Sequence, residues 1–337
     1  MSTIETQNTG NKNIKIVTIG GGTGNSIMLR GIKEITNNIT TIVTVADDGG
    51  GSGVLRRDLG MLPPGDIRAC LISLANTEPA MEKILQYRFK EGCLKGQSFG
   101  NLFLSAMADL YGGFDLGLKE ASNVLALTGK VLPMTLENVT LYARLEDGSI
   151  IEGESNITFL TRKSGGKIEE VFIKPELPKP MNETVDEIMK ADLILIGPGS
   201  LYTSIMPNIL VDNVAKALRD TKAPIYYATN VMTQAGETDN YSVTDHVNAI
   251  TKHAGGNIID KILVNEEEIP ELVRLKYYYE QKSEPVYLKP GEKESLEKLG
   301  YEVITGPFVD VKYNYIRTDA EKTAEAIFEN FSKMKLK

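Results

Sequence analysis

The sequence predicts an α/β protein built on a doubly wound, mostly parallel sheet with a small antiparallel β insert. Residues 14–19 form an apolar, β-branched run that continues into a glycine turn at 20–24 and then into a helical pattern. A second apolar run, residues 40–46, ends in two acids, and a third, residues 191–196, ends in glycines and hydroxyls. Strand, glycine turn, helix and strand in this order are typical of the first unit of a doubly wound sheet.

The length and composition are those of a globular protein. The chain has 337 residues, 42% of them hydrophobic and 24% charged, which suits one large or two modest domains. We expect a disordered N-terminal lead at residues 1–13 and one α/β domain at 14–337, with the β-rich insert at about 136–175. The net charge of −8 argues against a duplex nucleic acid as a partner.

The two cysteines, Cys70 and Cys93, form no CxxC pair and no cysteine–histidine cluster. This usage indicates a reducing compartment and argues against structural zinc. No run of about 18 apolar residues predicts a membrane span, and the polar first residues lack the apolar core of a signal peptide. We therefore expect a cytoplasmic protein.

The glycine turn after the first strand predicts a site for an anion. Gly21, Gly22 and Gly24 leave out the Cβ atoms that would keep a ligand away from the backbone. Asn25 or Ser26 is suited to cap the helix that follows. Free N–H groups at such a helix start, together with the helix dipole, favour a phosphate.

Asp47 and Asp48 follow the second strand, and another glycine-rich stretch, residues 49–53, comes directly after them. In dinucleotide-binding folds one acid in this place often holds a ribose. Two adjacent carboxylates beside a phosphate site could instead hold Mg²⁺ through their oxygens, or could simply cap the loop. The second acid, the second glycine stretch and Asn25 in place of the third glycine all depart from an NAD-binding pattern.

A segment broken by glycine and proline, residues 54–68, carries several charges. Arg56, Arg57 and Arg68 are suited to grip a phosphate through two N–H groups each. With the acids Asp58 and Asp66 they could equally form salt bridges on the surface. Loops at this edge of a sheet commonly carry function, and the sequence leaves both interpretations open.

Helices are predicted next, over residues 67–74, 80–89, from 99 onwards and 116–127. Asn101, at the start of the third, either caps it or contacts a substrate. Alternating apolar residues and turn signals then predict antiparallel strands over residues 136–153, 154–159 and 168–173. Prolines at 175, 178 and 180 mark the return to the main sheet.

The second half of the chain alternates between helices and strands. We expect helices over residues 182–190, 211–219, 244–254 and 318–334, and strands over 191–196, 224–230, 258–265, 285–288 and 301–304. Thr318 and Asp319 are suited to cap the last helix.

Further candidate binding residues lie in this half. Ser200 and Thr203 follow a strand end and could donate hydrogen bonds to a phosphate or a sugar. Asn230 ends the next strand, where an amide suits a base or a sugar. Residues 277–279 are three tyrosines, which offer either a stacking surface or half-buried packing. Arg317 could reach the site or only cap the region of the last helix.

Hydrolase chemistry is not expected. The only histidines, His246 and His253, lie in one helical pattern, and the chain has no GxSxG motif and no cysteine beside a histidine. A P-loop motif is also missing. Glycine turns, hydroxyls, amides and a few arginines fit either binding without turnover or metal-assisted phosphate transfer, with Asp47, Asp48 and Asp66 as the acidic groups.

Four motifs occur in order along the chain: GGGTG at 20–24, DDGG at 47–50, GPGSLYTS at 197–204 and NVMTQ at 230–234. Together they resemble the bacterial gluconeogenesis factor (YvcK-like) family, within the superfamily of 2-phospho-L-lactate transferase (CofD-like) proteins. The superfamily implies a Rossmann-like doubly wound domain with a smaller added region. Its transferase branch uses Mg²⁺ and a guanosine diphosphate-linked lactate, and transfers phospholactate to a deazaflavin.

The gluconeogenesis factor branch resembles binders of UDP-sugars such as UDP-N-acetylglucosamine (UDP-GlcNAc). It is linked to normal cell shape and wall synthesis during growth on gluconeogenic carbon sources. The residues favour this branch, because Ala46 stands before the paired acids where the transferase pattern carries an asparagine–threonine–glycine lead. The run at 206–208, Met-Pro-Asn, after GPGSLYTS also matches the gluconeogenesis factor pattern.

The resemblance implies a UDP-sugar-binding regulatory factor without turnover. Asp47, with Asp48 as its neighbour, would bind the ribose or a metal-bound water. The other implied ligand contacts are Gly21, Gly22, Thr23, Gly24 and Asn25 for the phosphate, Gly199, Ser200 and Thr203 for the diphosphate or sugar, Asn230 for orientation, Tyr278 for stacking and Arg317 for charge. The alternatives are a Mg²⁺-dependent transferase with Asp47 and Asp48 as metal ligands, and a disfavoured NAD-type dehydrogenase. Expected protein partners are a second copy of the chain and a protein of cell-wall synthesis or its regulation.

Overall fold

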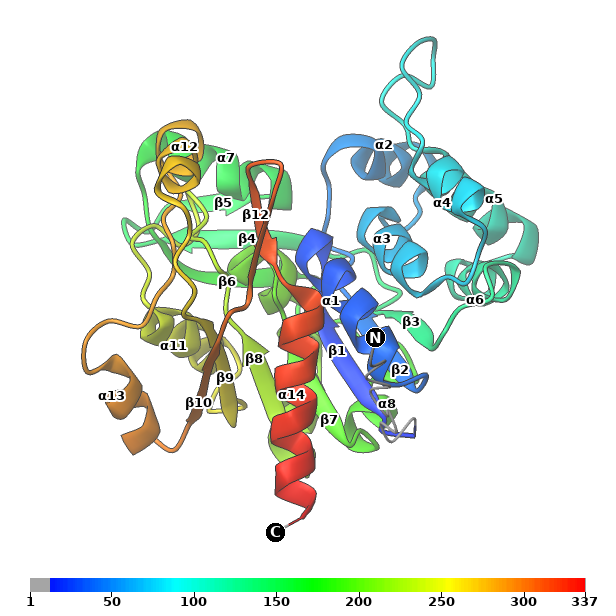
Figure 1. The fold of residues 1–337 in the computed structure, drawn as a ribbon. Helices are drawn as coiled ribbons and strands as arrows, with labels where there is room; N and C mark the ends of the chain where they lie inside the picture. Colours follow the sequence, from blue (N-terminus) through cyan, green and yellow to red (C-terminus); the bar gives the residue numbers. More distant parts are fainter. Residues whose placement is uncertain (1–12, 337) are drawn as a thin grey trace.

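The computed structural model describes residues 13–336, and a seven-stranded parallel sheet lies at their centre (Figure 1). Each neighbouring pair in the order β10-β9-β8-β7-β1-β2-β3 is parallel. The strands are β1 (Ile16–Gly20), β2 (Ile39–Val43), β3 (Lys130–Pro133), β7 (Leu193–Ile196), β8 (Ile225–Ala228), β9 (Lys261–Asn265) and β10 (Glu302–Gly306). The predicted doubly wound sheet is confirmed, and its order reverses between β1 and β7, where such folds bind ligands. The predicted lead at residues 1–13 lies, apart from Asn13, outside the described residues.

Helices cover both faces of the sheet, because its central strands are apolar on both faces. On one face, Ile16 and Leu195 meet Ile32 of α1 (Gly22–Ile35) and Phe331 of α14 (Ala320–Lys335). Successive side chains of a strand point to opposite faces, so Ile194 faces the second helical layer. That layer contains α8 (Thr184–Met189), the π-helix η1 (Leu201–Ile205), α9 (Met206–Ile209), α10 (Val214–Asp220) and α11 (Val243–His253).

The β insert is a three-stranded antiparallel sheet in the order β5-β4-β6. Its strands are β4 (Thr140–Leu145), β5 (Ile150–Glu152) and β6 (Ile168–Lys174). The strand expected at 154–159 is wrong, because this stretch begins helix α7 (Glu154–Ser164). The buried residues of α7, Ile157 and Thr161, are four apart, which is a helical spacing that the short apolar pattern did not reveal.

Most of the remaining helices form two groups, on either side of the carboxyl end of the sheet (Figure 1). One group consists of α2 (Gly50–Leu59), α3 (Gly65–Leu74), α4 (Pro79–Gln86), α5 (Phe99–Tyr111) and α6 (Phe114–Val124). The other lies near the insert and contains α12 (Glu271–Gln281) and the hairpin of β11 (Val309–Lys312) and β12 (Tyr315–Thr318). Strand β3 and helix α13 (Glu292–Lys298) were not predicted, and residues 285–288 form only a single bridge, between Met232 and Pro285.

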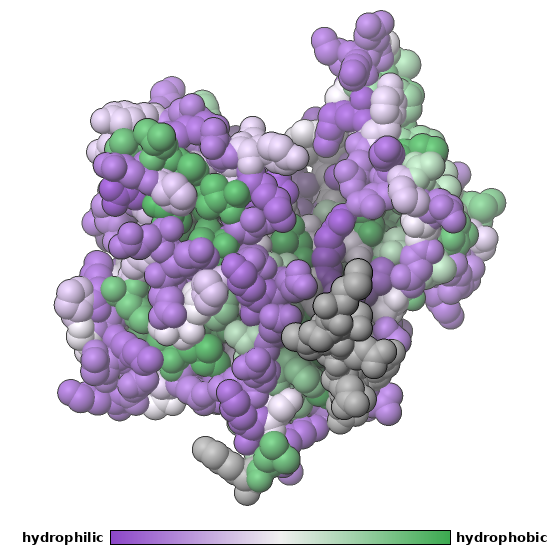
Figure 2. All heavy atoms as spheres, in the orientation of Figure 1, coloured by the Kyte–Doolittle hydropathy of each residue, from purple (hydrophilic) through white to green (hydrophobic). Residues whose placement is uncertain are grey.

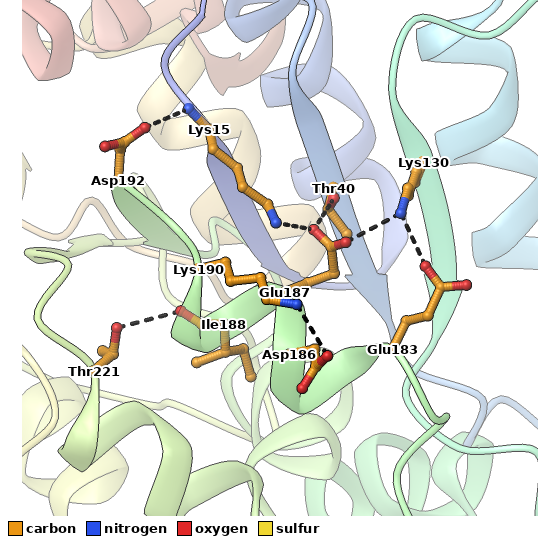
Figure 3. Close-up of polar contacts among 10 residues, drawn as sticks. All are labelled: Lys15, Thr40, Lys130, Glu183, Asp186, Glu187, Ile188, Lys190, Asp192 and Thr221. Atoms are coloured by element: carbon orange, nitrogen blue, oxygen red, sulfur yellow. Dashed lines mark hydrogen bonds and ion pairs between the residues drawn. The ribbon is translucent and has the colours of Figure 1, made fainter.

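A buried carboxylate, Glu187 of α8, joins three strands at the amino end of the sheet (Figure 3). It accepts hydrogen bonds from Lys15 Nζ at 2.7 Å, Thr40 Oγ1 at 3.0 Å and Lys130 Nζ at 3.1 Å. Burial would raise the pKa of Glu187, but the bonds from Lys15, Lys130 and Thr40 outweigh it and hold that pKa below its usual value. Its charged form therefore stabilises the sheet.

We expect Glu187→Gln to lower the free energy of unfolding by about 1–3 kcal/mol at pH 7. The lowered pKa means that the stabilisation is present above the usual glutamate pKa and is lost as pH falls through the folded-state value. Urea denaturation at pH 7 and at pH 3 should show the difference shrinking in acid. Glu183→Gln is the control, because Glu183 is half exposed and pairs only with Lys130; a loss as large as that of Glu187→Gln would contradict the assignment.

Candidate functional site

The candidate site lies where the carboxyl ends of β1, β2 and β7 meet. Gly20 ends β1, Asp47 and Asp48 follow β2, and Gly197 follows β7. Figure 2 shows the surface hollowed here, between the side with α7 and α12 and the side with α2 to α6. The sequence predicted this edge correctly, because parallel strands all end at the same side of a sheet.

The first glycine turn differs from its prediction, because helix α1 begins at Gly22, and its N-cap, Gly21, lies four residues before Asn25. Asn25 therefore lies inside the helix and does not cap it, and it is fully buried. Its Nδ2 donates to Thr41 Oγ1 at 3.0 Å and to Cys70 Sγ at 3.7 Å. Thr23 is exposed in the same turn and is left facing the cleft.

The carboxylate of Asp66 covers the first turn of α1. The backbone N–H of Gly22 donates to it, and a Cβ atom on Gly21 would stand 2.6 Å from its Oδ2. Gly24 serves the packing of the helix, because its Cβ would stand 2.6 Å from the carbonyl oxygen of Pro198. The glycines thus bring α1 close to Asp66 and to the second loop, and an acidic side chain already lies where a phosphate was predicted.

In the second predicted phosphate-binding loop, residues 197–204, some hydrogen-bond donors are likewise already bound by an internal acidic side chain. Glu237, 3% exposed, accepts from Thr158 Oγ1 at 2.8 Å, Thr203 Oγ1 at 3.2 Å and Gln234 Nε2 at 2.6 Å. The backbone N–H groups of Tyr202 and Thr203 donate to it as well. Burial raises the pKa of Glu237, and these hydrogen bonds oppose the rise. The hydroxyl of Thr203 is therefore directed into the protein, at 2% exposure.

Two other predicted residues of this loop do meet at the cleft. The N–H of Gly199 donates to Asn230 Oδ1 at 3.3 Å. Ser200 Oγ donates to Gln234 Oε1 at 2.6 Å. Both Ser200 and Asn230 are partly exposed.

The paired acids have different surroundings. Asp47 Oδ1 accepts from the N–H of Gly49 at 2.9 Å, and Asp48 Oδ1 accepts from the N–H of Ser155, at the start of α7, also at 2.9 Å. Asp47 therefore caps the loop that follows it, whereas Asp48 joins this loop to the start of α7. Within residues 13–336, no three Asp, Glu, His or Cys side chains are grouped to hold a metal ion.

Glu154 is a site residue that the sequence analysis missed, because a strand was predicted where α7 begins. Burial, followed by the charge of Asp47, raises the pKa of Glu154 to about 8. The same two causes raise the pKa of Asp66 to about 6. Carboxyl groups with strongly raised pKa values in a cleft are typical of binding and catalytic sites.

A groove of about 880 Å³ adjoins this edge, between α1, α3 and the β11–β12 hairpin. Thr23, Arg68 and Arg317 all line it. Arg68 Nε donates to Asn101 Oδ1 at 2.8 Å, while Ser98 caps α5. Within residues 13–336 neither Arg68 nor Arg317 forms an ion pair, which leaves both guanidinium groups available to an anion.

Other candidates lie elsewhere. Tyr278 is 44% exposed on α12, beside Tyr279, and does not line the groove. Arg56 donates to the backbone oxygens of Val139 and Asp47, so it holds the insert and not a ligand. Both histidines are internal, and His253 Nε2 accepts from the backbone N–H of Val171 at 2.9 Å.

No helix within residues 13–336 has both the length and the apolar character needed to cross a bilayer.

Comparisons with known proteins agree with the fold and the motifs. Residues 16–309 match the family model described as 2-phospho-L-lactate transferase CofD. The gluconeogenesis factors of Bacillus subtilis and Halalkalibacterium halodurans are each 46% identical to this chain over 94% of its length and 97% of theirs. A protein of Thermoanaerobacterium thermosulfurigenes is 53% identical over 93% of this chain and 95% of its own length.

A crystal structure of protein BH3568 from Bacillus halodurans has the same fold. It superposes with a TM-score of 0.89 at 45% sequence identity, and the alignment covers 94% of this chain and 99% of the other. Identity this high over nearly the whole length of both chains extends the similarity beyond the fold. The chain belongs to the gluconeogenesis factor family, within the CofD-like superfamily.

Proposed function

We propose that this gluconeogenesis-related factor binds a UDP-sugar, such as UDP-GlcNAc, and acts by binding and not by turnover. The observation that carries the proposal is the pair of guanidinium groups, Arg68 and Arg317, that face one groove beside Thr23 without an ion-pair partner in residues 13–336. Burial, followed by the charge of Arg88, lowers the pKa of Arg68, so an anion beside it is favoured. The two guanidinium groups are suited to bind the phosphate oxygens of a diphosphate.

The acidic side of the cleft suits the neutral part of such a ligand. Asp47, Asp66 and Glu154 are close enough to act on one another electrostatically, and carboxyl oxygens accept hydrogen bonds from sugar hydroxyls. The printed names of the Bacillus subtilis and Halalkalibacterium halodurans relatives support a role in gluconeogenic growth. A role in cell shape and wall synthesis, through a protein partner or a homodimer in the cytoplasm, remains part of this proposal.

One observation favours a second function, a transferase acting on a nucleotide-linked phosphate ester. Glu154, with a pKa of about 8, holds its proton at neutral pH and is suited to donate it to a leaving group. Calorimetric titration with UDP-GlcNAc, GDP and NAD, with and without Mg²⁺, followed by product analysis, separates the two. Binding of UDP-GlcNAc without product supports the regulatory factor, and turnover that is lost in Glu154→Gln supports the enzyme.

We expect Arg317→Ala to weaken UDP-GlcNAc binding by about 10- to 100-fold, because it removes a charge-assisted contact to the diphosphate. Isothermal calorimetry at fixed ionic strength measures the loss. Lys276→Ala is the matched control, because Lys276 lies over the Tyr315 ring of the same hairpin but does not line the groove. Equal losses of affinity in the two variants would show that binding depends only on the net charge of the protein. That result would contradict the assignment of Arg317 as a contact to the diphosphate.

A further inference from the structure

Several hydrogen-bond donors of the 197–204 loop are bound inside the protein. The N–H of Gly199 is bound by Asn230 Oδ1, and the hydroxyl of Thr203 by Glu237. Ser200 Oγ donates its single proton to Gln234 Oε1 at 2.6 Å. A hydroxyl has one proton and two lone pairs, so a Ser200 whose proton is used offers only acceptor capacity to the cleft.

Glu237 fixes the direction of this chain of hydrogen bonds. Its carboxylate receives donors from three segments, namely Thr158 of α7, the start of η1 and Gln234 Nε2 at 2.6 Å. The structure places the amide nitrogen of Gln234 on Glu237 and the amide oxygen on Ser200. Ser200 is consequently held as the donor to Gln234, with its lone pairs left for a ligand.

The first glycine turn, at the neighbouring strand end, also has a hydrogen-bond acceptor beside it. Asp66 lies over the first turn of α1 and takes the N–H of Gly22, and the acids Asp47 and Glu154 act on it electrostatically, with Arg68 as the opposing charge. Asp66 and the Ser200 hydroxyl thus both offer acceptor oxygens at the strand ends. The free donors, Arg68 and Arg317, line the groove beside it.

We propose that Ser200 is a specificity-determining residue that accepts a hydrogen bond from a sugar hydroxyl of the ligand, with Gln234 and Glu237 as its positioning residues. This inference rests on the proposed binding of a nucleotide sugar and gives the ligand an orientation. The diphosphate lies against Arg68 and Arg317, and a neutral sugar faces the glycine turns.

Analogues of UDP-GlcNAc with fluorine in place of one hydroxyl at a time, on the hexose or on the ribose, test the proposal. Fluorine resembles a hydroxyl in size but cannot donate. For wild-type protein we expect one analogue to bind about 10-fold more weakly than the parent, and its position identifies which sugar faces Ser200. In Gln234→Leu the hydroxyl of Ser200 is freed to donate to fluorine, so the discrimination should fall below about 3-fold.

Two further variants separate this role from a structural one. Ser200→Ala should also lose the discrimination, and Ser200→Thr, which keeps the hydroxyl, should retain it. If every analogue binds wild-type protein as tightly as the parent, or if the discrimination persists in Ser200→Ala, the inference is overturned. The wild-type series decides even where a variant does not fold. Failure of the parent UDP-GlcNAc to bind would instead reject the proposed function.

Discussion

Replacing Glu154 by glutamine is expected to make the protein more stable at alkaline pH, by roughly 1–3 kcal/mol at pH 9. Burial, followed by the charge of Asp47, raises the pKa of Glu154 to about 8 from its usual 4.5. The full shift would correspond to more, but part of the side chain remains open to solvent, so the value is reduced for screening. Glutamine has the same shape and does not ionise.

The pH dependence gives the sign of the effect. A carboxyl group with a raised folded-state pKa holds its proton more tightly in the folded protein, so its favourable contribution is complete below the unfolded value. That contribution is lost as pH rises through about 8, where the buried group ionises. The unfolding free energies of wild type and Glu154→Gln should therefore agree near pH 4, separate between about pH 4.5 and pH 8, and stay apart by a constant amount above pH 8.

Urea denaturation across this range is the measurement, and Glu169→Gln is the control. Glu169 is an exposed glutamate on β6, so its replacement should shift the curve by less than about 0.5 kcal/mol at any pH. Parallel curves for wild type and Glu154→Gln would contradict the raised pKa. A residue that costs stability at the strand ends of a doubly wound sheet is typical of a binding or catalytic group.

The sequence predicted the sheet well because its information is local. Buried strands such as β1 and β7 are continuous apolar runs bounded by glycines, and the side chains that follow them gather at one edge. The residues at which helices begin were harder to predict. Glycine has a low helix propensity, so the N-cap of α1 was expected at Asn25 or Ser26, yet the helix begins at Gly22 under the carboxylate of Asp66.

The chemistry of the two loops could not be read from residue types. Thr203 and Ser200 are both hydroxyls after a strand, but one donates to Glu237 and the other to Gln234, 34 residues away in each case. Only those long-range contacts show that the donors are already used. The sequence analysis missed Glu154 for a related reason. The helical spacing of the buried residues of α7 becomes evident only when the helix is packed against the insert sheet.

Gly24→Val is expected to lower the free energy of unfolding by about 3 kcal/mol, and this change distinguishes a packing role from a ligand role for the glycine turn. A Cβ atom at this position would stand 2.6 Å from the carbonyl oxygen and 2.9 Å from the carbonyl carbon of Pro198. Both are backbone atoms, which cannot move aside without shifting the loop after β7.

The control for Gly24→Val is the isosteric change Thr23→Val, one position earlier in the same helical turn. Thr23 is exposed and lines the groove, so its replacement should leave stability within about 0.5 kcal/mol but weaken UDP-GlcNAc binding. Thermal unfolding and calorimetric titration of both variants measure the two effects separately. A Gly24→Val protein as stable as wild type but unable to bind the ligand would show that the glycine makes room for the ligand. The contact with Pro198 predicts the opposite, a loss of stability that occurs with no ligand present.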